Sequence, residues 1–449
     1  MPILDPRTVR QQALEAFGED YMADIPPSGA WVDALKRGKQ EQVIPSLNNL
    51  VQILANDGNL PCPELNEFTN EVVTRLTDPV NGNLWTDSHD AGLRLLIERR
   101  YDMTVKRADL ADAILVHVKT HGFHPVRQYL RSLKWDGKQR ASRLWVDYLG
   151  APEDDYHVEV AEKMLLGAVV RVMEPGHKFD FVTIIEGAQG RGKSTFIEIL
   201  ASGWFAGLDA GTFENRTRLV EKMQGAWILE VPELSAFSKS EVQSIKDIVS
   251  TSSDKVRLAY GRRAAVFPRQ SIMIGSTNDD QYLRDQTGGR RFWPTLCRVS
   301  MIDTAKLRRE VQQIWAETFA CYLEAREVQP SGPLDLSLCS KAAQEVAFGI
   351  QAGRRPETAA EGLGGIVGEW LEGREDSCLI QIWTEAMRRD KESYNHQSAL
   401  LCREAVKAAG GWDATGDTRR FPVYGKQRVI RPTVPHRTGT VAKLFRLES

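Results

Sequence analysis

Hydrophobic residues follow a helical period over much of the first third of the chain. Apolar positions recur at i, i+3 and i+4, which predicts amphipathic helices at residues 46–57, 64–77, 90–102 and 107–122. No set of side chains in this region has the spacing of a catalytic site. We therefore expect residues 1–150 to form a helical N-terminal domain.

The middle of the chain alternates between continuous apolar runs and helical patterns. Short runs rich in β-branched residues at 181–185, 226–231 and 271–276 predict buried strands. Helical patterns surround them, and two long ones follow at 303–327 and 337–351. Strands that alternate with helices predict an α/β fold for a core over residues 151–352.

The last part of the chain has a different layout. A Gly-Arg-Arg-Pro segment at 353–356 predicts a linker, and residues 362–449 show three helical patterns and then two short strands at 421–425 and 427–432. Helices followed by a β-ribbon are typical of a winged helix. From residue 403 onward there are ten Lys or Arg and four Asp or Glu. This charge favours a duplex-DNA-binding domain over an ordinary basic tail.

Composition narrows the class of protein. A chain of 449 residues exceeds the size at which one core keeps growing, so we expect two or three domains. The net charge is −2, so any affinity for nucleic acid must come from local patches. Six scattered cysteines without a C-x-x-C pair suit free thiols in a reducing compartment. No apolar leader or membrane-spanning run occurs, so we expect a protein of the cytoplasm with no membrane partner.

The most informative stretch follows the first buried strand. Residues 187–194 read G-x-x-x-x-G-K-S and lead into a helical pattern, which is the context of a phosphate-binding loop. Glycines let backbone N–H groups approach phosphates, a lysine reaches the β- and γ-phosphates, and a serine hydroxyl can ligate Mg²⁺. The predicted ligands are ATP and Mg²⁺, and the predicted nucleotide-binding residues are Gly187, Gly190, Gly192, Lys193, Ser194 and Thr195.

Two further strands end in polar residues of the kind such a loop needs. The strand at 226–231 delivers Glu230 and Glu233, of which one can bind Mg²⁺ together with Ser194 and the other can activate a water. Glu230 is the better metal ligand by position, but the two roles could be reversed. Asn278 follows the strand at 271–276 and can orient water against the γ-phosphate, although asparagine also commonly ends strands as a turn residue.

Two basic segments complete the candidate chemistry. Residues 254–269 predict a hairpin with five basic residues and one acid, and its candidate DNA-binding residues are Lys255, Arg257, Tyr260, Arg262 and Arg263. On composition alone a solvated charged hairpin is the stronger interpretation. Arg290 and Arg291 follow two glycines. Either arginine could stabilise charge on a transferring phosphoryl group, or both could be solvated.

Several of these motifs occur together and in order in one family. The chain resembles the virulence-associated protein E family of phages, prophages and phage satellites, whose ATPase core is similar to superfamily 3 helicases. The resemblance runs through His124–Arg140, Glu186–Thr195, Trp227–Gly261 and Ser276–Pro294.

This resemblance implies a P-loop, AAA+-like core that assembles as a ring, commonly a homo-hexamer, with ATP between subunits. It implies that Glu230 and Glu233 are the acidic pair, that Asn278 senses the γ-phosphate, and that Arg290 or Arg291 acts on the neighbouring subunit. It also implies that the hairpin grips single-stranded DNA in the pore of the ring.

The combined hypothesis is an ATP-dependent, 3′-to-5′ DNA helicase that acts in replication initiation of a mobile element in a bacterial host cell, with host replication proteins as possible partners. The unwinding direction rests on the resemblance alone. Two alternatives remain open. One is a DNA-stimulated ATPase that remodels nucleoprotein without unwinding, and the other is an origin-binding protein that nucleotide merely switches.

Overall fold

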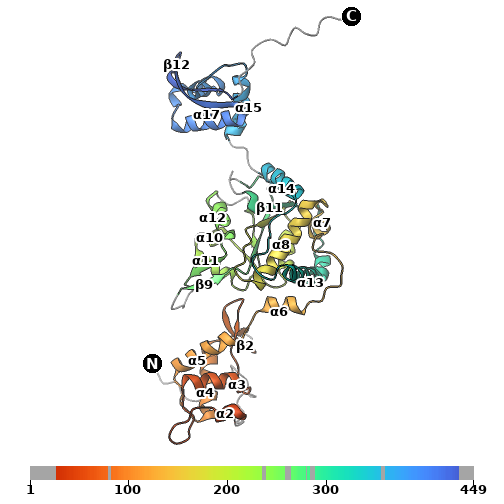
Figure 1. The fold of residues 1–449 in the computed structure, drawn as a ribbon, viewed down its shortest axis with the longest axis vertical. Coiled ribbons are helices and arrows are strands. Elements are labelled where there is room, and N and C mark those ends of the chain that lie inside the picture. Colours follow the sequence, from red (N-terminus) through yellow and green to blue (C-terminus); the bar gives the residue numbers. More distant parts are fainter. Residues whose placement is uncertain are drawn as a thin grey trace. The chain divides into compact units, whose positions relative to one another are not determined.

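The computed structural model describes residues 27–78, 82–234, 239–257, 264–279, 281–283, 289–354 and 359–433. Contacts between residues divide the chain into two compact units, 1–354 and 355–449 (Figure 1). Each unit is described separately below. Across the described residues, no helix is both long enough and apolar enough to cross a membrane.

A five-stranded parallel sheet forms the centre of the first unit. Its order is β11-β5-β10-β7-β6, and every neighbouring pair is parallel. The strands are β5 (Val182–Glu186), β6 (Phe205–Gly207), β7 (Ile228–Val231), β10 (Ile272–Thr277) and β11 (Phe292–Leu296). The predicted strands at 181–185, 226–231 and 271–276 are confirmed, and the α/β class is confirmed with them.

Alternate residues of these strands serve two separate hydrophobic cores. Ile185 and Ile274 point into one core, whereas Ile184 and Met273 belong to the other. A strand places successive side chains on opposite faces, so both faces of this sheet must be covered by helices. This explains why the strands are continuous apolar runs in the sequence.

Helices cover each face of the sheet. The first core is completed mainly by helices α8 (Asp155–Met173), α9 (Lys193–Leu200), α13 (Thr304–Val328) and α14 (Lys341–Gly353). The second is completed by α10 (Ala210–Glu214), α11 (Arg216–Met223) and α12 (Lys239–Val249). Figure 1 shows α8 and α13, which pack against each other, in this unit. Both long helices expected after residue 303 are present.

Packing in the first core continues on both sides of residue 150. Helices α6 (Pro125–Ser132) and α7 (Leu144–Leu149) contribute buried side chains such as Leu130 and Trp145 to it. A separation of the chain at residue 150 stays a prediction.

The N-terminal region contains a small sheet as well as helices. The strand order of this sheet is β3-β2-β1-β4. The helices of the region are α2 (Ala30–Asp33), α3 (Leu47–Asn56), α4 (Asp87–Tyr101) and α5 (Arg107–Thr120). The strands are β1 (Glu64–Asn66), β2 (Glu71–Asp78), β3 (Gly82–Leu84) and β4 (Gly122–Phe123).

The expectation of a helix at 64–77 is therefore wrong. Residues 64–78 form a β1–β2 hairpin whose turn is closed by Asn66, with its side-chain oxygen accepting from the N–H of Phe68 at 3.0 Å. Asn70 takes the left-handed conformation at φ 57°. Turn chemistry of asparagine and β-branched residues such as Val72 and Val73 outweighed the helical spacing.

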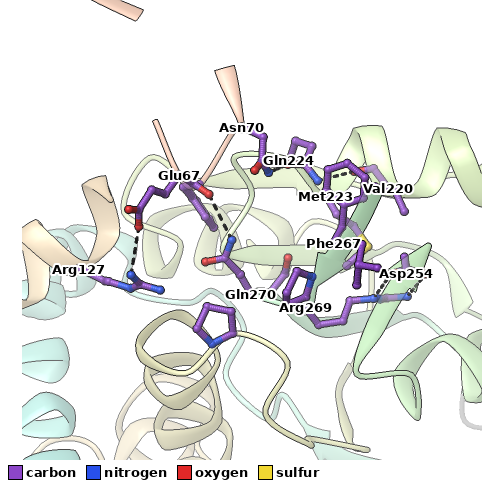
Figure 2. Close-up of a pocket in the computed structure, with 15 residues that line it drawn as sticks. Glu67, Asn70, Arg127, Val220, Met223, Gln224, Asp254, Phe267, Arg269 and Gln270 are labelled. Atoms are coloured by element: carbon purple, nitrogen blue, oxygen red, sulfur yellow. Dashed lines mark hydrogen bonds and ion pairs between the residues drawn. The ribbon is translucent and has the colours of Figure 1, made fainter. Parts of the chain in front are cut away.

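The turn of this hairpin docks on the core of the same unit (Figure 2). Phe68 is 2% exposed within the first core, and its carbonyl accepts from the N–H of Gly225 at 3.1 Å. Glu67 forms an ion pair with Arg127 at 3.2 Å. A cavity of 190 Å³ lies between this turn and the segment around Gln270.

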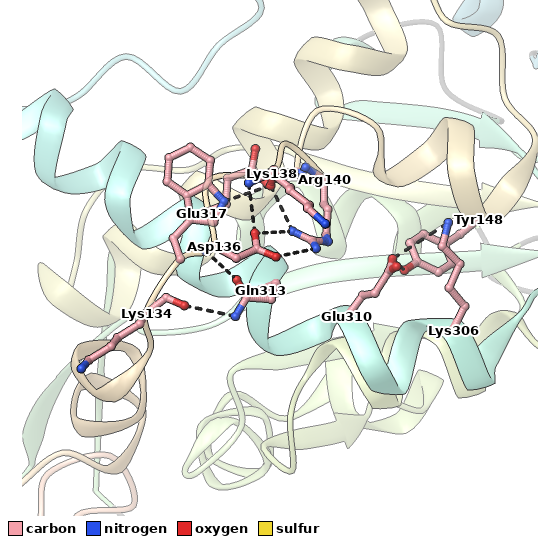
Figure 3. Close-up of polar contacts among 11 residues, drawn as sticks. Lys134, Asp136, Lys138, Arg140, Tyr148, Lys306, Glu310, Gln313 and Glu317 are labelled. Atoms are coloured by element: carbon pink, nitrogen blue, oxygen red, sulfur yellow. Dashed lines mark hydrogen bonds and ion pairs between the residues drawn. The ribbon is translucent and has the colours of Figure 1, made fainter.

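A loop at 134–140 fastens the start of the core to helix α13 (Figure 3). The N–H of Asp136 donates to Gln313 at 2.9 Å, and the Gln313 amide donates to the carbonyl of Lys134 at 3.1 Å. Glu317 is 4% exposed and accepts from the N–H of Arg140 at 2.6 Å and from the next N–H at 2.9 Å. The buried carboxylate thus satisfies backbone donors that no regular element would pair.

The second unit is small and mixed. It contains α15 (Ala359–Leu371), α16 (Leu379–Gln381) continued by a π-helical turn, α17 (His396–Ala409) and the antiparallel ribbon β12 (Trp412–Phe421) and β13 (Gly425–Pro432). The strand expected at 421–425 is wrong. Residues 422–424 are the turn of the ribbon, where Pro422 cannot donate to a ladder and Val423 has φ 67°.

Candidate functional site

The glycine-rich loop connects the end of β5 to the start of α9. Gly187, Gly190 and Gly192 have φ values of 141°, 81° and 87°, a region that favours glycine. A Cβ atom added at Gly187 would lie 3.2 Å from the carbonyl oxygen of Cys297. The segment between β11 and α13 also holds the loop, because the N–H of Ile302 donates to the carbonyl of Arg191 at 3.0 Å. The glycines are therefore needed to turn the chain at this point.

Lys193 begins helix α9 and is turned back over the loop. Its ammonium group donates to the carbonyl of Gly187, to that of Ala188 at 2.9 Å and to Oδ1 of Asn278 at 2.9 Å. The residue is 8% exposed, and burial lowers the pKa of Lys193 below its ordinary value. The predicted site residues Lys193 and Asn278, which follow neighbouring strands of the sheet, are thus brought together.

Ser194 and Glu230 also meet at this point. The Ser194 hydroxyl donates to Oε1 of Glu230 at 2.7 Å, and the Ser276 hydroxyl donates to the same oxygen at 2.8 Å. Glu230 is 4% exposed and lies inside β7, whereas Glu233 is exposed beyond the strand with φ 49°. A hydroxyl and a carboxylate oxygen are ligands that Mg²⁺ prefers, so this pair is chemically suited to the metal.

All these groups lie at one edge of the sheet because the strands that carry them are parallel. The loop follows β5, Asn278 follows β10, and Glu230 lies near the end of β7. In open α/β sheets, ligands bind at the carboxyl ends of the strands. The first turn of α9 adds N–H groups and the positive end of the helix dipole. Thr195 is half-buried in that turn. This edge can therefore hold an anionic phosphate group.

The arginine pair lies at the opposite edge. Arg290 and Arg291 immediately precede β11, whose first residue Phe292 pairs with Val182 at the start of β5. Five residues of strand, about 16 Å, therefore separate the arginines from the glycine-rich loop. Arg291 donates to the Ser250 hydroxyl at 2.9 Å, whereas Arg290 is exposed. The structure does not bring these arginines to the loop of the same chain.

The basic hairpin consists of β8 (Ser253–Val256) and β9 (Ala265–Pro268). Lys255 and Arg257 are exposed on it. The predicted DNA-binding residues Tyr260, Arg262 and Arg263 lie outside the described residues.

The base of this hairpin is held by a buried ion pair. Asp254 binds Arg269, and the two side chains are 1% and 2% exposed. A second arginine, Arg216, reaches the same carboxylate from α11 and is 40% exposed. Arg269 is thus neutralised inside the protein and adds nothing to the charge that the hairpin presents to solvent.

Sequence reasoning missed a polar cluster directly beneath the loop. Glu186, the last residue of β5, is 2% exposed and forms an ion pair with Arg354 at 2.7 Å. Its Oε1 also accepts from the Tyr282 hydroxyl at 2.7 Å, and burial beside this carboxylate raises the pKa of Tyr282 well above its ordinary value. An acid that ends an otherwise apolar strand was the available signal.

No group of three or more His, Cys, Asp or Glu side chains that could hold a metal ion occurs within the described ranges. His117 and His121 stack with ring centroids 4.1 Å apart, and both ring nitrogens of buried His117 have no hydrogen-bond partner among the described residues. Burial lowers the pKa of His117 to about 4. The neutral ring is therefore part of the N-terminal core.

Comparison with known proteins identifies the region that contains the site. Residues 130–346 match the sequence model of the virulence-associated protein E-like domain. This stretch, a little under half of the chain, is similar to that domain. It includes the glycine-rich loop, the acidic strand, the hairpin and the arginine pair, so all the predicted site residues fall inside it. No curated protein matches the sequence.

Solved structures show a similar fold at low sequence identity. The A form apo structure of the NrS-1 C terminal region-CTR has a TM-score of 0.50 and 10% identity, and the match covers 85% of this chain and 99% of that chain. An apo structure of NrS-1 residues 305–718 has a TM-score of 0.46 and 9% identity, with 85% and 98% covered. The first of these shows that a similar fold occurs in another protein.

Proposed function

We propose that this protein is an ATP-dependent DNA helicase of the superfamily 3 type, with a P-loop, AAA+-like core, that acts in replication initiation of a phage, prophage or phage satellite. The observation that carries the proposal is the meeting of Lys193, Ser194, Glu230 and Asn278 at the carboxyl edge of one parallel sheet. The virulence-associated protein E-like domain supports the setting of a mobile element.

The loop residues would bind the phosphates of ATP. The Lys193 ammonium already lies against two loop carbonyls and Asn278, so it is held where a β- or γ-phosphate oxygen would replace those acceptors. Gly187, Gly190 and Gly192 leave room for backbone N–H groups to face the phosphates. Asn278 would then report on the γ-phosphate through the same lysine.

Ser194 and Glu230 fit a magnesium ion, since their oxygens already lie 2.7 Å apart. When bound, Mg²⁺ would neutralise charge on the β- and γ-phosphates. Glu233 is exposed beyond β7 and would hold the attacking water and accept its proton, which assigns the base to Glu233 and the metal to Glu230. The buried position of Glu230 and the exposed position of Glu233 support this division of roles.

The position of the arginines supports a ring. Arg290 lies across the sheet from the loop of its own chain, so we assign it to the site of a neighbouring subunit. Arginine supplied in trans is a common way to stabilise charge in phosphoryl transfer. Arg290 is the better candidate because it is exposed, whereas Arg291 is bonded to Ser250. Head-to-tail contacts of this kind close into rings when the rotation between subunits permits closure, and the family resemblance implies a hexamer.

Two features support DNA as the partner. Lys255 and Arg257 are exposed on a hairpin whose base is locked by Asp254, and such a hairpin can follow a single strand through its phosphates. The elements of the second unit follow one another in the order of a winged helix. Helix α15 comes first, then Ser377, which forms an isolated bridge with Ile430, then α17, and finally the β12–β13 ribbon. That unit would hold duplex DNA at an origin.

The setting of the proposal is the cytoplasm of a bacterial host cell, with host replication proteins as possible partners. The unwinding direction, 3′ to 5′, follows the family resemblance. Hydrolysis at the interfaces between subunits would move the hairpins along one strand.

Strand displacement from a 3′-tailed duplex tests this function. We expect the wild type to displace the strand with ATP, and we expect Lys255→Ala with Arg257→Ala to lose displacement while keeping hydrolysis. Displacement of a 5′-tailed duplex alone would contradict the direction. Hydrolysis stimulated by DNA without displacement would favour a remodelling ATPase. Full biological activity of Glu233→Gln would favour an origin-binding protein in which nucleotide binding only switches the shape of the protein.

A further inference from the structure

The ion pair between Glu186 and Arg354 lies between the glycine-rich loop and the end of the first unit. Glu186 is the residue before Gly187, and Arg354 is the last residue of the unit. Two nitrogens of the Arg354 guanidinium donate to the two carboxylate oxygens, each at 2.7 Å. The Glu186 side chain is 3% exposed and that of Arg354 is 23% exposed. A planar, two-bond pair of this kind fixes direction as well as distance.

The same carboxylate also accepts a hydrogen bond from the segment that follows β10 and begins with Asn278. The Tyr282 hydroxyl donates to Glu186 Oε1 at 2.7 Å, and Tyr282 lies four residues beyond Asn278. The N–H of Leu283 donates to the carbonyl of Arg354 at 3.0 Å. Polar contacts therefore run from Lys193 to Asn278, along the chain to Tyr282, and through Glu186 to Arg354.

The main chain around Glu186 is fixed on both sides. Its carbonyl accepts from the N–H of Cys297 at 2.8 Å, and the N–H of Gly187 donates to the carbonyl of Thr277 at 3.1 Å. The ion pair with Arg354 thus adds a side-chain anchor to the backbone contacts that hold this first peptide of the loop. Removing Arg354 would leave a buried carboxylate with the Tyr282 hydroxyl as its remaining donor among the contacts described here, which is unfavourable.

We propose that Arg354 is a positioning residue that acts through Glu186: its ion pair holds the glycine-rich loop ready for nucleotide and ties the loop to the point at which the chain continues into the second unit. The inference rests on the proposed function, because it assigns nucleotide to that loop. It gives the proposed ATPase a route of hydrogen bonds and one ion pair from the nucleotide site to the last residue before the unit that would hold duplex DNA.

Hydrogen exchange on the full chain, measured without nucleotide, tests the positioning role. We expect Arg354→Ala to raise exchange in residues 182–196 on the order of tenfold and Arg354→Lys to restore part of the protection. The matched control is Arg326→Ala, which breaks a similar two-bond pair with Glu174 elsewhere in the core. Unchanged exchange at 182–196 in both Arg354 variants, or an equal rise in the control, would overturn the proposal.

A second measurement separates this inference from the proposed function. With a fluorescent ATP analogue, we expect Arg354→Ala to raise the Kd between 5- and 150-fold, roughly the usual range of coupling between two sites. Arg326→Ala should lower thermal stability without changing that Kd. An analogue that fails to bind the wild type would refute the proposed nucleotide site, while the exchange result would still decide whether Arg354 orders the loop. Equal Kd values for wild type and Arg354→Ala would contradict the positioning role.

Discussion

Replacing Asp254 by asparagine should loosen the basic hairpin and destabilise the first unit. The substitution keeps the shape of the side chain and removes its charge from the pair with Arg269. Both partners are almost fully buried, and breaking such a pair costs about 3–5 kcal/mol because the remaining charge is left uncompensated. The contact with Arg216 adds about 0–1 kcal/mol, since Arg216 is 40% exposed.

The expected shift can be measured by thermal unfolding of the full chain. The first unit spans residues 1–354, and an unfolding entropy of about 2.1 cal/mol/K per residue means that each kcal/mol lowers the midpoint by about 1.3 °C, so Asp254→Asn should lower it by roughly 4–7 °C. Asp209→Asn is the matched control, because its pair with Arg218 is about half exposed on both sides and should leave the midpoint unchanged. Asp254→Leu combined with Arg269→Met should recover most of the loss. A shift below about 2 °C for Asp254→Asn would refute the buried-charge argument.

Three further predictions concern catalysis and pH. Glu233→Gln should lower kcat for ATP hydrolysis about 10²- to 10⁴-fold and leave the Kd of a fluorescent ATP analogue unchanged; a loss under threefold would exclude Glu233 as the base. Arg290→Ala should lower the rate of ATP hydrolysis about 10³-fold. Activity recovered on mixing this variant with subunits that keep Arg290 would show that the arginine acts in trans. No recovery would contradict action in trans. Burial lowers the pKa of both His117 and His124 to about 4. The unfolded chain, whose histidine pKa is about 6.5, therefore binds more protons, and stability should fall as pH drops from about 6.5 towards 4, by roughly 1.4 kcal/mol per pH unit for each histidine. Denaturant unfolding of His117→Leu should show about half of this pH dependence, and an unchanged dependence would contradict the assignment.

The sequence was informative wherever one local pattern decided the structure. The run of β-branched residues before Gly187 predicted the strand, the loop and the helix that follows, because glycine spacing and strand length act over a few residues. The edge of the sheet where Lys193, Glu230 and Asn278 meet could also be expected, since each follows an apolar run.

Other features could not be predicted because they depend on distant partners or on weak local signals. The β1–β2 hairpin was mistaken for a helix, since its apolar spacing also fits a helical face. Strand β12 is mostly polar and exposed, so it has no hydrophobic alternation to detect. Glu186 and Arg354 are 168 residues apart, and nothing in either local sequence indicates the other. Arg269 was counted as surface charge because its burial against Asp254 is a tertiary feature.

The most direct test of the central claim is ATP hydrolysis by the wild type and by Lys193→Ala, with and without single-stranded DNA. We expect hydrolysis by the wild type that DNA stimulates, and none by Lys193→Ala, because Lys193 is the cation that the loop holds beside Asn278. Equal hydrolysis by the two proteins, or none by the wild type in either condition, would contradict the claim that this loop is the site of an ATPase.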